Sequence, residues 1–146
     1  MSTPGTSKSL IVVGDTDGLI AILHEEDINH KKAVETVTRL LIHNAQTVFP
    51  LTTIAETITT LIRKLNKPGL ATRVVERITS GELAIENTDT DMLDKALKVF
   101  DPKGSKKRTI FDALVIATAK KLNTNIIFST DEWYSKLGFT LAMNLA

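Results

Sequence analysis

The sequence predicts a single α/β domain with a mostly parallel sheet of about four or five strands and helices on both faces. Short apolar, β-branched segments alternate with longer amphipathic segments along the chain. No two strand segments are joined by a hairpin turn, so right-handed helical crossovers must connect them. A length of 146 residues suits one domain, which we expect over 10–146 after a short flexible tail at 1–9.

The first half of the chain begins with a strand at 10–14, where apolar residues run into Gly14. A helix is expected at 18–24, and Asp27 is the expected N-cap of a longer helix that extends to about residue 44. The next expected elements are a strand at 47–51 and a helix at 52–66, which ends at the sequence Lys67-Pro68-Gly69.

The second half continues the same alternation of helices and strands. The expected elements are a helix at 69–80, a strand at 83–86, helices at 89–100 and 109–122, a strand at 125–130, a short helix at 131–138 and a last strand at 139–143. A basic turn at 101–108 separates the two consecutive helices. We find no internal repeat and no linker.

The composition excludes several classes of site. The absence of cysteine rules out disulfides, thiolate zinc sites and cysteine nucleophiles, and it fits a reducing, cytoplasmic setting. No apolar run approaches the roughly 20 residues of a membrane-spanning helix. The glycine-rich nucleotide loops and the Gly-x-Ser-x-Gly elbow are also missing. A net charge of +1 does not by itself indicate a nucleic-acid-binding protein.

Four acidic residues are candidates for one site, because ligands bind beyond the carboxyl ends of parallel strands. Asp15 and Asp131 follow the first and fourth expected strands, Glu56 lies early in the helix after the second strand, and Asp112 lies in the first turn of the helix before the fourth. Asp112 shares a face with apolar residues, and a buried carboxylate is costly unless it is paired or binds a metal.

Each of these acids also has a purely structural explanation. Asp15 is suited to a turn, Asp112 is favoured by the helix dipole, and Asp131 is suited to an N-cap. The helical wheel places Glu56 off the apolar stripe, so a solvated glutamate is the alternative there.

The sequence GDTDG at residues 14–18 fits two kinds of site. A strand followed by Asp-x-Asp-Gly is typical of phosphatases of the haloacid dehalogenase type, in which Asp15 would be a nucleophile. That class also needs a later Ser or Thr, a lysine and a paired acid. The only candidate pair, in NTDTD at 87–91, precedes the segment FST at 128–130, which is the wrong order.

The other kind of site belongs to the PIN-domain nucleases. The segments VVGDTDGLIAIL, HKKA, PLTTIAETITTLIRK, RTIFDALVIATAKKLN and IIFSTDEWYSKLG resemble the successive motifs of that family, and most closely those of the VapC-like toxin ribonucleases. The resemblance extends in order over residues 10–142. It implies that Asp15, Glu56, Asp112 and Asp131 are the catalytic residues and hold Mg²⁺ or Mn²⁺, ions that prefer such carboxylate oxygens.

The residues beside these acids are also suggested by the resemblance. Thr16 and Thr130 would line the site, and so would Asp17, which replaces the Asn or Ser that is common in the family. The basic residues expected to bind nucleic acid are Arg63, Lys64, Lys106, Lys107 and Arg108.

The implied activity is metal-dependent hydrolysis of RNA that leaves a 5′-phosphate and a 3′-hydroxyl. The expected partners are an RNA substrate, an antitoxin protein and a second copy of the chain. A solitary RNA-processing nuclease and a scaffold that binds RNA or a protein without cleavage remain alternatives. If a metal binds, the four carboxyl groups should lie close together.

Overall fold

The computed structural model describes residues 10–145, so the expected tail at 1–9 lies outside the described residues. The described chain contains a five-stranded sheet in which every pair is parallel, with the order β3-β2-β1-β4-β5. The strands are β1 Ile11–Gly14, β2 Gln46–Pro50, β3 Ala84–Glu86, β4 Ile126–Phe128 and β5 Thr140–Leu141. The predicted parallel α/β fold is therefore confirmed.

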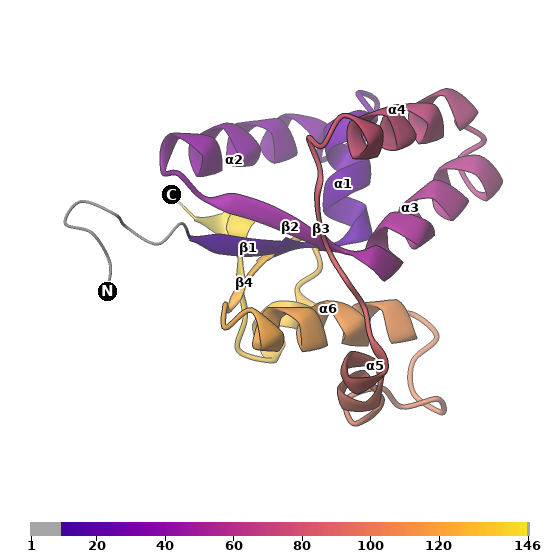
Figure 1. Cartoon of the computed structure of the whole chain (residues 1–146), viewed down its shortest axis with the longest axis vertical. Coiled ribbons are helices and arrows are strands. Elements are labelled where there is room, and N and C mark those ends of the chain that lie inside the picture. The colour runs from indigo at the N-terminus through magenta and orange to yellow at the C-terminus, as the bar shows by residue number, and fades with distance from the viewer. Residues whose placement is uncertain (1–9, 146) are drawn as a thin grey trace.

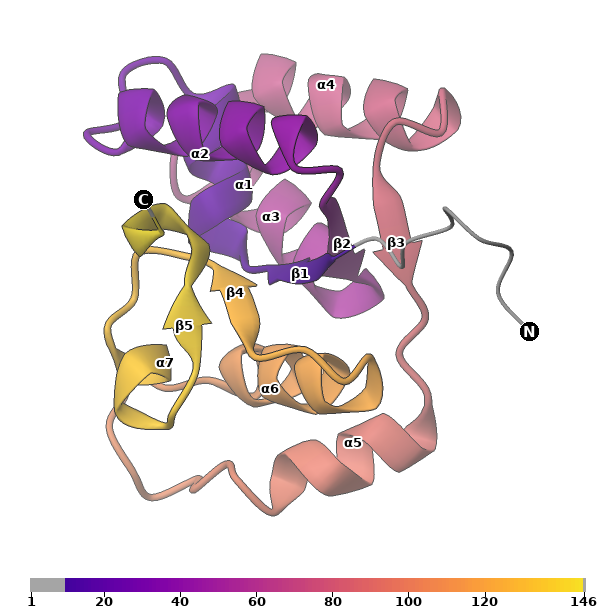
Figure 2. The ribbon, with the colours of Figure 1, turned by 90° about the vertical axis from the view of Figure 1, so that its left-hand side faces the viewer.

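Helices cover both faces of the sheet (Figures 1 and 2). They are α1 Thr16–Leu23, α2 His30–Ile42, α3 Leu51–Arg63, α4 Pro68–Thr79, α5 Thr90–Leu97, α6 Ile110–Lys121 and α7 Trp133–Lys136, and a 3₁₀ turn follows at Ala142–Asn144. Figure 1 shows α1, α2 and α4 on one side of the sheet and α5 and α6 on the other. None of the helices within residues 10–145 is long and apolar enough to cross a membrane.

Successive residues of the central strand β1 point to opposite layers, as expected for a strand buried on both faces. Val12 packs with Ala33 and Leu40 of α2, whereas Val13 packs with Val115 and Ile116 of α6. Because β1 lies between β2 and β4, its carboxyl end is next to the ends of both neighbours. The strands β2 and β3 lie on one side of β1, and the strands β4 and β5 lie on the other. Open parallel sheets bind ligands at the point where the strand order changes sides in this way.

Helix α1 lies unusually close to β4 because its third residue, Gly18, has no side chain. A Cβ atom on Gly18 would lie 2.5 Å from the carbonyl oxygen of Phe128 and 2.7 Å from its ring. This close approach brings the first turn of α1 against the end of β4, where the chain continues to Asp131.

Two sequence predictions need correction. The long second helix begins at His30, and Asp27 is not its N-cap, because the Asp27 carboxylate accepts the Asn29 amide at 2.8 Å in the preceding turn. The last strand is also shorter than expected, because a 3₁₀ turn begins at Ala142. Both differences lie at element boundaries, where capping and turn geometry are hardest to predict.

Candidate active site

Asp15 lies directly after β1 and is the N-cap of α1. Its carboxylate accepts the Thr16 amide at 2.7 Å and the Tyr134 hydroxyl at 2.5 Å. The residue is only 5% exposed. Burial raises the pKa of Asp15 well above its ordinary value, and the nearby charges of Asp17 and Asp112 raise it further.

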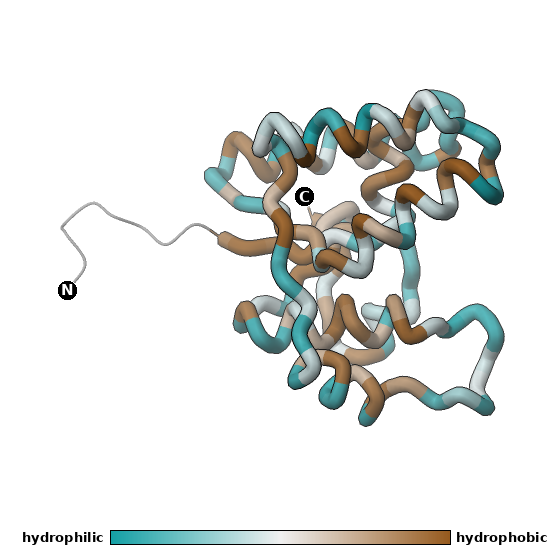
Figure 3. Tube along the Cα trace, turned by 45° about the vertical axis from the view of Figure 1, so that its right-hand side comes forward, coloured by the Kyte–Doolittle hydropathy of each residue, from teal (hydrophilic) through white to brown (hydrophobic). Residues whose placement is uncertain are grey.

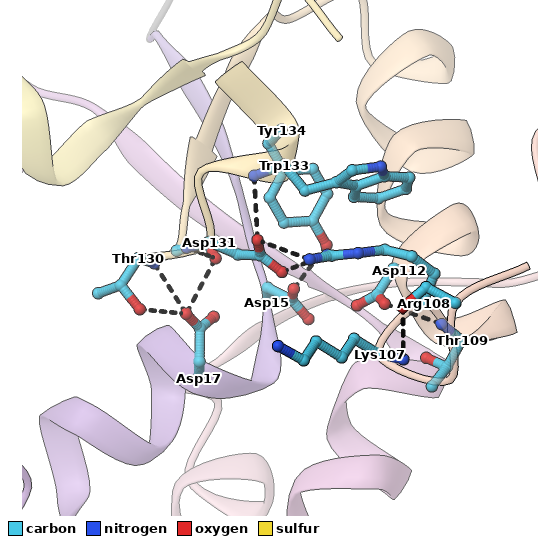
Figure 4. Close-up of polar contacts among 12 residues, drawn as sticks. Asp15, Asp17, Lys107, Arg108, Thr109, Asp112, Thr130, Asp131, Trp133 and Tyr134 are labelled. Atoms are coloured by element: carbon cyan, nitrogen blue, oxygen red, sulfur yellow. Dashed lines mark hydrogen bonds and ion pairs between the residues drawn. The ribbon is translucent and has the colours of Figure 1, made fainter. Parts of the chain in front are cut away.

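Asp112 lies in the first turn of α6, where one carboxylate oxygen accepts the Thr109 amide at 2.9 Å. Burial raises the pKa of Asp112, and the charges of Asp131 and Asp17 add to the shift. Asp112 is also one of the charges that raise the pKa of Asp15. Figure 4 shows these two side chains in the same site, Asp15 from the start of α1 and Asp112 from the first turn of α6.

Glu56 lies in the second turn of α3 and accepts a hydrogen bond from the Thr16 hydroxyl. Burial raises the pKa of this half-buried carboxyl, and Asp112 is again a contributing charge. The structure therefore joins Glu56 to the acidic cluster, and a solvated surface glutamate is not what is observed.

Asp131 is the one acid of the group that has a basic partner. Both of its carboxylate oxygens bind the Arg108 guanidinium, at 2.5 and 3.2 Å, and one also accepts the Trp133 amide at 3.0 Å. Burial raises the pKa of Asp131, but the hydrogen bond and charge of Arg108 outweigh it, so the pKa lies below its ordinary value. The guanidinium also lies 4.7 Å from the centre of the Trp133 ring (Figure 4).

Asp17 holds the end of β4 against α1. One of its oxygens accepts three hydrogen bonds, from the Ser129 hydroxyl at 3.0 Å and from the amide and hydroxyl of Thr130 at 2.8 and 2.7 Å. The other oxygen accepts the Gly18 amide at 2.9 Å. The extra acid in GDTDG therefore acts as a clamp between two segments, and its lone pairs are largely used within the protein.

The cluster combines negative charge with few positive partners. Among residues 10–145, Asp15, Glu56 and Asp112 form no salt bridge, whereas Asp131 does. In the same described range, no three His, Asp or Glu side chains are grouped closely enough to hold one metal ion as they stand. The expected convergence is thus partial: the acids influence one another, but Arg108 holds Asp131 and Thr16 holds Glu56.

Comparison with known proteins decides the family. The PIN domain family model matches residues 12–139. The chain belongs to the PIN-domain family. This assignment leaves no support for the phosphatase interpretation of GDTDG.

A solved structure shows a similar fold in another protein. It is the toxin VapC20 of Mycobacterium tuberculosis, which is described as cleaving the sarcin–ricin loop. The two structures superpose with a TM-score of 0.74 at 19% sequence identity, over 88% of this chain and 96% of VapC20. A search of curated proteins found no match.

The sequence did not reveal two neighbours of the acids in this PIN domain. Tyr134 is fully buried and binds Asp15, although the residues are 119 positions apart. Arg108 was expected to bind nucleic acid, yet its guanidinium binds Asp131 within the chain. No local sequence pattern predicts either contact, because both depend on how the segment after β4 packs against the rest of the domain. The other predicted basic residues, Arg63, Lys64, Lys106 and Lys107, are exposed.

The contact between Tyr134 and Asp15 gives a first prediction. Replacing Tyr134 with phenylalanine keeps the packing against Trp133 but removes the donor to a buried carboxyl group. We expect the free energy of unfolding to fall by about 1–3 kcal/mol in urea titrations. Thr38→Val is the matched control, because it removes an exposed hydroxyl group on α2. It should change the free energy of unfolding much less. Equal stability of Tyr134→Phe and wild type would show that the hydrogen bond is not a stabilising one.

The raised pKa values predict a pH dependence of stability. The fold favours the protonated forms of Asp15, Glu56 and Asp112. Their contribution to stability is therefore complete below their ordinary pKa values, 3.8 for Asp and 4.5 for Glu, and is lost as the pH rises through the raised values. Metal-free protein should therefore be more stable at about pH 5 than at about pH 7. Asp131, whose pKa is lowered, has the opposite effect on stability, and this effect is confined to pH values below its ordinary pKa of 3.8.

Urea unfolding in EDTA over this pH range measures the effect. The variant Asp15→Asn removes the most buried of the three groups, so its stability should change less with pH than that of wild type. Parallel pH profiles for the two proteins would contradict the prediction.

Proposed function

We propose that this PIN domain is a divalent-metal-dependent endoribonuclease. The observation that supports this most is the group of three buried or half-buried carboxyl groups, Asp15, Glu56 and Asp112, none of which forms a salt bridge among the described residues. Burying negative charge in this way costs free energy unless a cation neutralises it. The group lies at the carboxyl edge of the sheet, where an extended substrate can reach it.

The donor set fits Mg²⁺ or Mn²⁺, since all its ligand atoms are carboxylate oxygens. Asp15, Asp112 and Glu56 would hold the ion once their side chains move closer together than they lie here. Asp131 would join them when Arg108 releases it. A bound ion supplies Lewis-acid stabilisation of phosphate charge and a more acidic water molecule.

The chain's own residues have three further tasks. Tyr134 and the Thr16 amide fix the orientation of Asp15, and Asp17 fixes the segment that contains Thr130 and Asp131. The Arg108 guanidinium lies at the edge of the cluster, where it is suited to binding a phosphate in two-point geometry. The exposed residues Lys64 and Lys107 add positive charge along the approach of the RNA.

We further propose that the chain acts in the cytoplasm as the toxin of a toxin–antitoxin pair. A gene for a small antitoxin beside its own gene, and copurification of the two proteins, test this role. The described toxin activity of VapC20 supports this role, and a small antitoxin and a second copy of this chain are the expected partners. A solitary RNA-processing nuclease is the alternative.

The test is cleavage of a mixed RNA pool by purified protein in Mn²⁺, Mg²⁺ or EDTA. We expect cleavage with either ion, none in EDTA, and products with a 5′-phosphate and a 3′-hydroxyl. Equal cleavage in EDTA would contradict the role of the metal. Binding of RNA without cleavage in any condition would favour the non-cleaving scaffold.

A further inference from the structure

A small cavity of about 180 Å³ lies beside the acidic cluster and has no role in the function proposed above. It is bounded by the loop between α5 and α6, the first turn of α6 and the start of α7. Its lining includes Phe100, Trp133, Arg108, Thr109 and Asp101. Arg108, which lines the cavity, also binds Asp131 of the acidic cluster (Figure 4). The cavity and the acidic cluster therefore share one wall.

From this arrangement, we propose that the cavity binds one base of single-stranded RNA next to the cleaved phosphodiester. The proposal rests on the proposed ribonuclease function and extends it to the recognition of the substrate. A cavity of this volume is large enough for a single nucleobase but not for a folded segment of a protein partner.

The walls have the chemistry that a base requires. Phe100 and Trp133 are aromatic, and proteins that bind single-stranded RNA stack its bases on such side chains. The guanidinium of Arg108 already lies over the Trp133 ring, and this planar group also stacks on bases. Phe100 is only partly buried, so part of its surface is open to a ligand.

Polar groups at the cavity favour the edge of a base over a purely apolar ligand. The Thr109 side chain forms a capping box with Asp112 at the start of α6 and also lines the cavity, and its hydroxyl hydrogen can be donated to the edge of a base. Asp101 has a carboxylate that accepts the Lys103 amide at 2.9 Å and retains capacity to accept an exocyclic amino group. A carboxylate in the lining disfavours a phosphate in the cavity itself.

The surrounding charge favours RNA as the occupant. The loop between α5 and α6 contains Lys103, Lys106 and Lys107, all exposed, and it is coloured hydrophilic in Figure 3. These cations attract the phosphates on either side of a bound base. The cavity thus offers aromatic walls for the base, while the adjacent loop offers positive charge for the backbone.

Trp133 provides a direct readout, because it is the only tryptophan in the sequence. The probe is a mixed-sequence RNA of five nucleotides, added to wild-type protein in EDTA so that cleavage does not interfere. We expect a saturable change in Trp133 fluorescence. An abasic ribose-phosphate chain of the same length should bind roughly ten-fold more weakly, because stacking is lost.

A variant locates the binding. Phe100→Ala should weaken binding of the same labelled RNA, measured by fluorescence anisotropy, by roughly ten-fold. Phe139→Ala is the matched control, since it removes a partly buried aromatic ring near α7 that does not line the cavity. Circular dichroism checks that both variants fold, and the comparison of natural with abasic RNA needs no variant.

The outcomes separate this proposal from the proposed function. Equal binding of natural and abasic RNA overturns the base site, even if the protein cleaves RNA. An equal loss of binding in Phe100→Ala and Phe139→Ala, with both folded, also overturns it. Base-dependent binding by a protein that cleaves no RNA would support the site while contradicting the nuclease function.

Discussion

Replacing Asp112 with asparagine should reduce RNA cleavage by this protein about 100-fold or more, because even outer-shell partners of a metal contribute about 10–100-fold. The substitution keeps the shape of the side chain, and its carbonyl oxygen can still accept the Thr109 amide. Only the negative charge at the cluster is lost. Since burial already disfavours the charged form of Asp112, the fold should be as stable as that of wild type.

The measurement compares cleavage rates and thermal unfolding of the same preparations in Mn²⁺. Asp91→Asn is the matched control, because Asp91 is also a first-turn aspartate of a helix but lies exposed and pairs with Lys95. The control should cleave as wild type does. Full activity in Asp112→Asn would remove Asp112 from the site and would leave the proposed metal site without its α6 ligand.

Replacing Gly18 with alanine should destabilise the protein by about 1–3 kcal/mol or more, as is typical when a side chain is forced into a packed site. The added methyl group would lie 2.5 Å from the Phe128 carbonyl oxygen, and backbone cannot move aside as a flexible side chain can. Helix α1 would have to move away from β4. This loss of stability would be opposite to the usual effect, because alanine normally stabilises a helix relative to glycine.

Gly69→Ala is the matched control for this substitution. Gly69 also lies in the first turn of a helix, α4, but no atom lies within 4 Å of its would-be Cβ. The control should be neutral or stabilised by up to about 1 kcal/mol. Urea unfolding of both variants measures the difference. If Gly18→Ala were as stable as Gly69→Ala, close packing between α1 and β4 would not be what requires glycine.

The fold was predictable because its determinants are local. Apolar segments such as 10–14 and their regular alternation with helical segments indicate a parallel sheet with helices on both faces. The order of the strands was not predicted. The acids were predictable for a related reason. Asp15 and Asp131 follow strands whose ends must meet at one edge of the sheet, so their positions along the sequence already imply proximity.

The partners of those acids were not predictable, since they depend on tertiary packing. The sequence gives no reason for Asp17 to bind Thr130 or for Arg108 to bind Asp131 in preference to RNA. Glu56 shows the same limit: its place on the helical wheel suggested a solvated residue, but Thr16 of another helix binds it. Pairwise contacts between distant segments decide these environments.

The clamp formed by Asp17 has a consequence for how the protein is made. Asp17 binds Thr130, 113 residues later, and Asp15 binds Tyr134, 119 residues later. A chain that emerges from the ribosome with its N-terminal end first therefore exposes Asp15 and Asp17 long before their partners have been synthesised. The hydrogen bonds that hold the acidic cluster therefore form only after residues 130–134 have been released, so the site of this nuclease is one of the last parts of the domain to be completed.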